Sequence, residues 1–189
     1  MIERLKEKYK NEVVKKMMER FGYKNPLEVP KIEKVVLNVG FGKQVAGKST
    51  EEINKIVNYV IEDLTMIAGQ RAVKTLARKS ISAFKIRKGL PIGAKVTLRK
   101  QRMWDFLERL IHIVLPRTRD FKGISEKAVD KQGNLTIGIE EHIAFPEIAP
   151  EKTKFNFGLQ ITIVNTAKSR EEGLELFKML NFPIREEKN

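Results

Sequence analysis

The chain has 189 residues, a formal net charge of +13 at neutral pH and no cysteine. The missing cysteines exclude disulfides, thiolate zinc sites and cysteine nucleophiles, and the length predicts a single domain. The N-terminal stretch MIERLKEKYKNEVVKKMMERF is charged throughout and no apolar run could span a bilayer, so we expect a cytosolic protein without a membrane partner. The positive charge predicts a polyanionic partner, either nucleic acid or an anionic surface.

The first half of the chain predicts helices and strands in alternation. Apolar residues spaced for one helical face predict helices over residues 3–21 and 50–68, each followed by a glycine. Strands are predicted over 31–40, KIEKVVLNVG, and over 71–77, RAVKTLA. Residues 79–93 predict a long loop with a basic tip, because glycine and proline interrupt a run of cations.

The second half predicts four more strands and two helices. AKVTLR, residues 94–99, alternates as a strand does, and a third helix is predicted from Gln101 to Val114, closed by Pro116. The stretch PRTRDFKGIS is predicted to be irregular, and KAV and NLTIGI to form a hairpin around DKQG. FNFGLQITIVN predicts a strand and SREEGLELFKML a C-terminal helix. Late strands without intervening helices favour an α+β fold with a mainly antiparallel sheet, helices on one face and a long basic loop.

The stretch GKQVAGKS, Gly42 to Ser49, matches the phosphate-binding loop of nucleotide-binding enzymes. The same residues have a second interpretation, because Ser49 and Glu52 form a capping box that needs no ligand. No acidic residue stands where a magnesium ligand is needed at the end of a buried strand, since Glu140 follows a predicted hairpin. We therefore expect no catalytic site, metal or cofactor, and keep nucleotide binding at Gly42 to Ser49 as the alternative function.

Between Asp63 and Asp105 the chain has no acidic residue, but it has eleven lysines and arginines. A solvated surface normally mixes both signs, so this interval predicts a surface that binds nucleic acid. Three neutral hydrogen-bonding residues, Asn38, Gln70 and Thr97, stand among the cations and are candidates for specific contacts. Because the cations lie on strands and a loop rather than on one helix, folded RNA is favoured over duplex DNA. A basic protein that binds any nucleic acid remains a third possibility.

Several long motifs closely resemble the bacterial form of the family of ribosomal protein five of the large subunit. They are VPKIEKVVLNVG, ARKSISAFKIRKGLPIGAKVTLR, RMWDFLERLIHIVLPRTRDFKGIS, EEHIAFPEI and GLQITIVNTAKSREEGLELF. The resemblance implies a ribosomal protein that binds 5S rRNA through its sheet and contacts P-site tRNA through an extended basic loop. Its implied partners also include 23S rRNA, other proteins of the central protuberance and a small-subunit head protein at an intersubunit bridge.

The resemblance also implies which residues make these contacts. The 5S rRNA set combines the three neutral residues with cations on the strands: Lys31, Lys34, Asn38, Gln70, Arg71, Lys74, Lys95, Thr97 and Arg99. The tRNA-binding loop is implied to lie within residues 79–93 and, with Arg78 before it, to act through Arg78, Lys79, Ser80, Ser82, Phe84, Lys85, Ile86, Arg87 and Lys88. The second half of the phosphate-loop match falls where the family is expected to vary, which favours the capping box.

Overall fold

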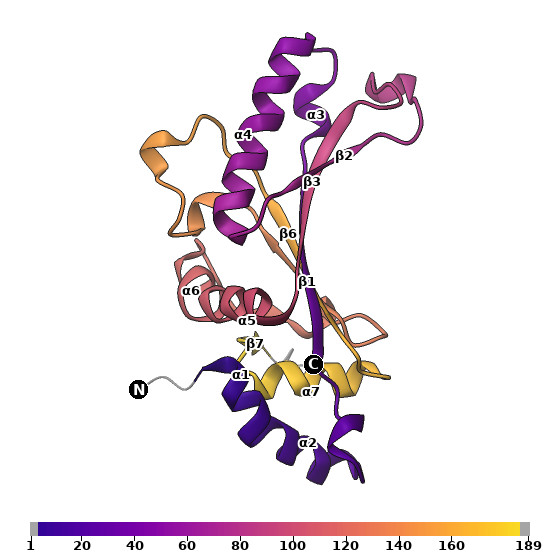
Figure 1. Ribbon diagram of the computed structural model, residues 1–189, viewed down its shortest axis with the longest axis vertical. Helices are drawn as coiled ribbons and strands as arrows, with labels where there is room; N and C mark the ends of the chain where they lie inside the picture. Colours follow the sequence, from indigo (N-terminus) through magenta and orange to yellow (C-terminus); the bar gives the residue numbers. More distant parts are fainter. Residues whose placement is uncertain (1–3, 186–189) are drawn as a thin grey trace. The chain divides into compact units, whose positions relative to one another are not determined.

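The computed structural model describes residues 4–185, in which helices and strands are interspersed (Figure 1). The helical segments are α1 (Leu5–Lys8), η1 (Tyr9–Val13), α2 (Val14–Phe21), η2 (Pro26–Glu28), α3 (Gly42–Val45), α4 (Thr50–Ala68), η3 (Ser82–Phe84), α5 (Lys100–Arg109), η4 (Leu110–Val114), α6 (Leu115–Arg117), η5 (Glu126–Ala128), η6 (His142–Ala144), η7 (Pro150–Lys152) and α7 (Arg170–Met179). The strands are β1 (Ile32–Gly40), β2 (Val73–Leu76), β3 (Pro91–Leu98), β4 (Ile124–Ser125), β5 (Leu135–Ile139), β6 (Leu159–Asn165) and β7 (Ile184–Arg185).

Five strands form one sheet in the order β2-β3-β1-β6-β5. The sheet is mainly antiparallel, which confirms the predicted α+β class. The strands β4 and β7 form a separate parallel pair, which the sequence did not predict because each has only two residues and they lie far apart in the chain.

The chain divides into two compact units. Unit 1 comprises residues up to Val35, Arg99–Ile137 and the residues from Thr162 onward, and unit 2 comprises Val36–Leu98 and Gly138–Ile161. In unit 1, α1 packs against α5, and the Tyr9 and Trp104 rings lie 5.8 Å apart. The Tyr9 hydroxyl also donates to the Pro30 carbonyl at 3.0 Å.

Unit 2 contains α4, which packs against β2 and β3, and α3, which packs against α4 and β3 (Figure 1). The buried residues of α4 include Val57, Val60 and Leu64, and the buried side of β3 consists of Ala94, Val96 and Leu98. The helix begins and ends at the predicted residues, because Ser49 caps its start and Gly69, at φ 62°, provides the left-handed turn at its end.

Two predicted helices differ in detail from the structure. The first predicted helix is one helical run interrupted by the π turn η1, and its predicted first residue, Glu3, lies outside the described residues. Pro116 does not close the third predicted helix, because α6 continues to Arg117. The π turn η4 shifts the hydrogen-bond register, so the proline stands at the start of a new α-helical turn, where its missing N–H costs little.

Three strand predictions also need correction. The stretch FNFGLQITIVN becomes a strand only from Leu159. The KAV arm of the predicted hairpin contributes only one antiparallel bridge, between Val129 and Leu135, although the turn between them forms as expected. Residues 91–93, predicted as the end of the long loop, belong to β3, because Gly93 pairs with Thr75 and Pro91 with Leu76.

Candidate nucleic-acid interface

The side of β1 and β3 that α4 does not cover carries polar residues. Burial alternates along both strands, so Leu37 and Val39 are buried while Asn38 is exposed, and Val96 is buried while Lys95 is exposed.

The two strands are antiparallel neighbours, which fixes the residues that face each other across them. The Phe41 N–H donates to the Ile92 carbonyl at 2.9 Å. Because β1 ends just before Phe41 and β3 runs on from Ile92, the strands overlap only if they run in opposite directions. Counting back from this bond along β1 and forward along β3 puts Asn38 across from Lys95.

The Gln70 side chain makes a hydrogen bond to the backbone of β3. It lies just after Gly69, which ends α4, and its Nε2 donates to the Thr97 carbonyl oxygen at 3.1 Å. The Thr97 side chain lies on the Lys95 side of β3, two residues along the strand. The structure therefore brings Asn38, Lys95 and Thr97 to one side of the sheet, which we call the outward face, and places Gln70 next to Thr97.

The polar side chains of Asn38 and Thr97 are available to an external partner. Within residues 4–185 neither side chain has a hydrogen-bond partner, while Gln70 uses one amide hydrogen on Thr97. Asn38 is exposed and Thr97 is half-buried. A fixed strand thus presents an amide and a hydroxyl whose hydrogen bonds a ligand can complete.

Lys74 lies away from the outward face, and Arg71 lies in the turn before β2. In the register of β2 and β3, Lys74 pairs with Ala94, whereas Val73 pairs with Lys95. Paired residues point to the same side of a sheet, so Lys74 points to the side of Ala94, on which α4 packs. Both Arg71 and Lys74 are exposed, but the structure does not bring Lys74 together with Lys95.

The other three cations of the predicted 5S rRNA set belong to unit 1. Lys31 is fixed by its backbone, since its N–H donates to the Thr166 hydroxyl at 3.0 Å. Lys34 is half-buried on β1. Arg99 already has an acidic partner, with Nη1 3.1 Å from Glu33 Oε1. This hydrogen bond, together with the nearby Lys34, lowers the pKa of Glu33 below its ordinary value.

The basic loop between β2 and β3 is an ordered extension of the hairpin that these strands form. Ile81 and Ile86 exchange backbone hydrogen bonds at 2.9 and 3.2 Å, the turn η3 lies between them, and the Ser80 hydroxyl accepts the Lys88 N–H at 2.9 Å. Phe84, at the tip, is 65% exposed. All nine residues predicted for the tRNA contact therefore lie on one structured projection, and all are exposed except Ile86, which is half-buried.

The segment from Gly42 to Ser49 does not have the form of a phosphate-binding loop. Its first four residues are the helix α3, where a phosphate loop needs open backbone N–H groups. The capping box is present: the Ser49 hydroxyl lies 2.8 Å from Glu52 Oε2, and the Ser49 N–H donates to the same oxygen at 3.0 Å. These hydrogen bonds, first the backbone one, lower the pKa of Glu52, as does Lys48. The geometry thus disfavours the nucleotide-binding alternative.

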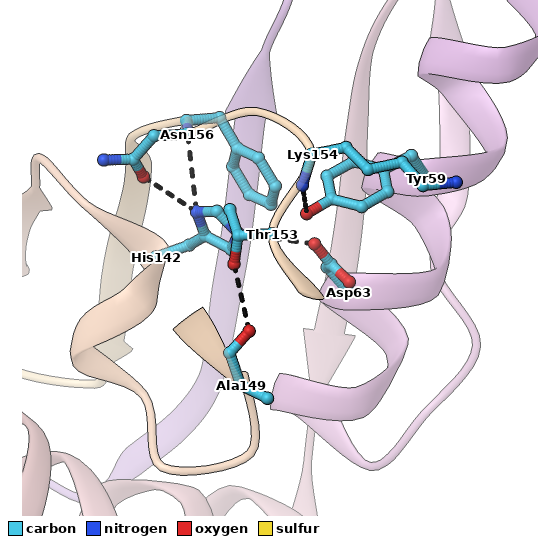
Figure 2. Close-up of polar contacts among 8 residues, drawn as sticks. Tyr59, Asp63, His142, Ala149, Thr153, Lys154 and Asn156 are labelled. Atoms are coloured by element: carbon cyan, nitrogen blue, oxygen red, sulfur yellow. Dashed lines mark hydrogen bonds and ion pairs between the residues drawn. The ribbon is translucent and has the colours of Figure 1, made fainter. Parts of the chain in front are cut away.

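The buried His142 provides a structural contact and no open catalytic site. Figure 2 shows it between Asn156 and Asp63 of α4, with Nδ1 2.9 Å from Asn156 Oδ1 and Nε2 3.3 Å from Asp63 Oδ2. The latter two atoms approach without the alignment of a hydrogen bond. His142 also stacks on Phe157 at 3.9 Å and is 0% exposed. No substrate can reach this imidazole, so its role is to hold the 142–157 segment against α4.

Two kinds of site are absent from residues 4–185. No cluster of three or more histidine or carboxylate side chains could hold a metal ion. No helix in this part of the chain is both long and apolar enough to cross a membrane.

Sequence reasoning missed Gln160 as a candidate for the outward face. This residue is exposed between the buried Leu159 and Ile161 on β6, and β6 is the neighbour of β1. The burial alternation in GLQITIVN contained the signal that Gln160 points away from the core. The sequence could not show that β6 lies next to β1.

Comparison with known proteins gives matches along nearly the whole chain. Residues 25–87 match the family model described as ribosomal protein L5, and residues 91–184 match the ribosomal L5P family C-terminus. A protein of Desulforapulum autotrophicum is 52% identical over 181 residues, which cover 96% of this chain and 98% of the relative. Proteins of a Thermoanaerobacter species and of Caldanaerobacter subterraneus are each 51% identical with the same coverage. All three relatives are called large ribosomal subunit protein uL5.

Proposed function

Because the chain belongs to the ribosomal protein L5 family, we propose that it binds 5S rRNA through the outward face and P-site tRNA through the basic loop. The family makes the chain a structural protein of the large ribosomal subunit, not an enzyme. It is a component of the cytoplasmic ribosome, where rRNA is its partner.

The observation that supports 5S rRNA binding is the pair of unengaged polar side chains on the outward face. The side chains of Asn38 and Thr97 have no hydrogen-bond partner in the described chain, and Lys95 lies beside them. Cations supply affinity for phosphates, while neutral groups at fixed positions determine which RNA fits and in which register. The cations of unit 1 and Arg71 are further candidates for phosphate contacts, and Gln160 is a further candidate for a polar one.

The basic loop supports contact with a second RNA. From Arg78 to Lys88 it carries five cations and no acidic residue, together with an exposed Phe84 on which a base or ribose can stack. In the assembled ribosome we propose that the occupant is P-site tRNA. We also propose contacts with 23S rRNA, with other proteins of the central protuberance and with a small-subunit head protein across the subunit interface.

The test of 5S rRNA binding is a titration of the full-length protein against two RNAs at two salt concentrations. One RNA is 5S rRNA and the other is an unrelated folded RNA of equal length. Electrostatic binding weakens steeply as salt rises for both RNAs, whereas fixed hydrogen bonds keep the preference for one of them. We expect a preference for 5S rRNA that persists at the higher salt. Equal affinity for both RNAs, falling together as salt rises, would reject the specific site and favour nonspecific binding.

A further inference from the structure

The segment from Gly42 to Ser49 contains two lysines that are not part of the capping box of Ser49 and Glu52. Lys43 is exposed on α3, and within residues 4–185 it has no ion-pair partner. Lys48 precedes the helix cap, with its Nζ 4.0 Å from Glu52 Oε1 in a pair whose side chains are 42% and 55% exposed. Such an exposed pair contributes little to stability, so Lys48 can exchange its carboxylate partner for a phosphate at small cost.

This segment lies directly against the basic loop. A Cβ placed on Gly42 would lie 3.8 Å from Ile86 Cδ1, and one placed on Gly47 would lie 3.9 Å from Lys85 Cδ. The side chains of Ile86 and Lys85 therefore lie next to Gly42 of α3 and Gly47 of the turn that follows it. The chain thus joins two segments that are separated by the whole of α4 in sequence.

The joined surface is strongly cationic. The exposed cations on its two parts are Lys43, Lys48, Lys79, Lys85, Arg87 and Lys88. The acidic residues next to it are Glu51 and Glu52, and Glu52 is engaged by Ser49 and Lys48.

We propose that Gly42–Ser49 and the basic loop form one surface for the phosphodiester backbone of folded RNA, in which Lys43, Lys48 and Lys85 contact phosphates. The inference rests on the proposed function of the loop, because the occupant is the same RNA, a tRNA. In this proposal the segment that resembles a phosphate-binding loop does bind phosphates, but those of an RNA chain. It binds them through charged side chains, without a nucleotide or magnesium.

The test compares three charge-matched double variants of the full-length protein. One variant is Lys43→Gln with Lys48→Gln, the second is Lys79→Gln with Lys88→Gln in the loop, and the control is Lys10→Gln with Lys15→Gln, two exposed lysines of unit 1. Each removes two charges. The affinities for deacylated tRNA and for 5S rRNA are measured over a series of salt concentrations. Far-ultraviolet circular dichroism and a melting curve verify that each variant is folded.

If the inference holds, Lys43→Gln with Lys48→Gln weakens tRNA binding and lowers the slope of log affinity against log salt by about 1.5. This value follows because each phosphate that is no longer neutralised reduces the slope by about 0.7 to 0.9. The control variant keeps the wild-type slope, and 5S rRNA affinity stays unchanged in the variant at 43 and 48.

Two other results separate the inference from the function it rests on. If the loop variant binds tRNA more weakly while the variant at 43 and 48 matches the control, Gly42–Ser49 is not part of the surface and the inference is wrong. If the wild-type protein binds tRNA no better than the loop variant does, the loop proposal itself fails, and the inference fails with it. Equal decreases in all three variants would show an effect of net charge alone and would also overturn the inference.

Discussion

The side chains of Asn38 and Thr97 differ from that of Gln70 in whether they already make a hydrogen bond within the protein. Gln70 donates an amide hydrogen to the Thr97 carbonyl, so part of its function is to fix the end of α4 to β3. The side chains of Asn38 and Thr97 make no hydrogen bond to any other described residue. A side chain without an internal partner is hydrated when the protein is alone in water, and it needs a hydrogen bond from RNA once RNA excludes that water.

We therefore expect Asn38→Ala and Thr97→Ala each to weaken 5S rRNA binding by about 1–3 kcal/mol, the cost of leaving a buried polar partner on the RNA unpaired. Isothermal titration calorimetry at one fixed salt concentration measures this change in binding free energy. Asn54→Ala, at an exposed position of α4, serves as the matched control, and we expect no change there. Unchanged affinity in both test variants would reject the assignment of these two residues.

The register of β2 and β3 gives a second prediction at this scale. Lys95 lies on the outward face and Lys74 on the opposite side, although both are exposed lysines of the same hairpin. We expect Lys95→Gln to lower the salt slope of 5S rRNA binding by about 0.7 to 0.9, the value for one phosphate, and Lys74→Gln to leave it near the wild-type value. Equal effects of the two substitutions would mean that RNA also contacts the side that carries α4.

At the scale of elements, the capping box determines how α4 responds to pH. The hydrogen bonds from Ser49, with Lys48 nearby, lower the pKa of Glu52 in the folded protein. A carboxyl group whose pKa is lowered by folding adds stability above its unfolded pKa and loses it as pH falls through the folded value.

The difference in unfolding free energy between wild type and Glu52→Gln should therefore have its full value at pH 7. It should decrease as the pH falls below 4.5, the ordinary pKa of a glutamate side chain. Urea denaturation at pH 7 and at pH 3.5 measures this difference. Glu51→Gln, in the same first turn but outside the capping box, is the control. A difference that stays constant between the two pH values would show that the Glu52 carboxylate does not act as a cap.

The contact of α4 with the 142–157 segment depends on Asp63. This carboxyl group is almost fully buried, and it faces an imidazole that is 0% exposed (Figure 2). The Tyr59 hydroxyl accepts the Lys154 N–H at 2.9 Å one helical turn earlier, so polar side chains fix the segment to α4 at two points.

We expect Asp63→Ala to destabilise the protein by about 1–3 kcal/mol, because it leaves His142 without its polar neighbour in the interior. A double-mutant cycle with His142→Ala, followed by thermal or urea denaturation, should show that the two effects are not additive. Glu62→Ala, one residue away on the same helix and at an exposed site, should change stability by less than about 0.5 kcal/mol. Additive effects at 63 and 142 would contradict the role of the pair.

At the scale of the whole molecule, the two proposed RNA sites are linked through β3. The outward face includes Lys95 and Thr97 of β3, whereas the tRNA site is the extension of the β2–β3 hairpin beyond its paired strands. The Ala77 N–H donates to the Leu90 carbonyl at 2.8 Å and the Gly89 N–H donates to the Ala77 carbonyl at 2.9 Å, which closes the hairpin before the extension begins. The extension can therefore be shortened without removing the pairing of β2 and β3.

Replacing residues 82–88 by a short glycine turn should weaken tRNA binding while 5S rRNA affinity stays within about twofold of wild type. This expectation follows because the removed loop charge affects distant phosphates only through screened electrostatics. Filter binding with both RNAs measures the two affinities, and circular dichroism checks the fold. A collapse of 5S rRNA binding in a correctly folded deletion protein would show that the loop belongs to the 5S rRNA site.

The sequence by itself determined the α+β class, the position of α4 to the residue, the capping box and the cationic interval without acids. These features are local: they depend on apolar periodicity, on a serine and a glutamate three residues apart, and on the order of charges along the chain. The long motifs were also sufficient to identify the family, because several of them match at once.

Only the tertiary structure decided which of these residues face the same way. The register of β2 and β3 puts Lys74 and Lys95 on opposite sides of the sheet. Gln160 is a candidate for the outward face because β6 lies beside β1. Lys85 lies next to Gly47 because the loop folds onto α3. The same holds for Asp63, a charged residue on the buried side of α4 whose partner lies far along the chain. Pairing and packing join segments distant in sequence, and no local pattern records which segments meet.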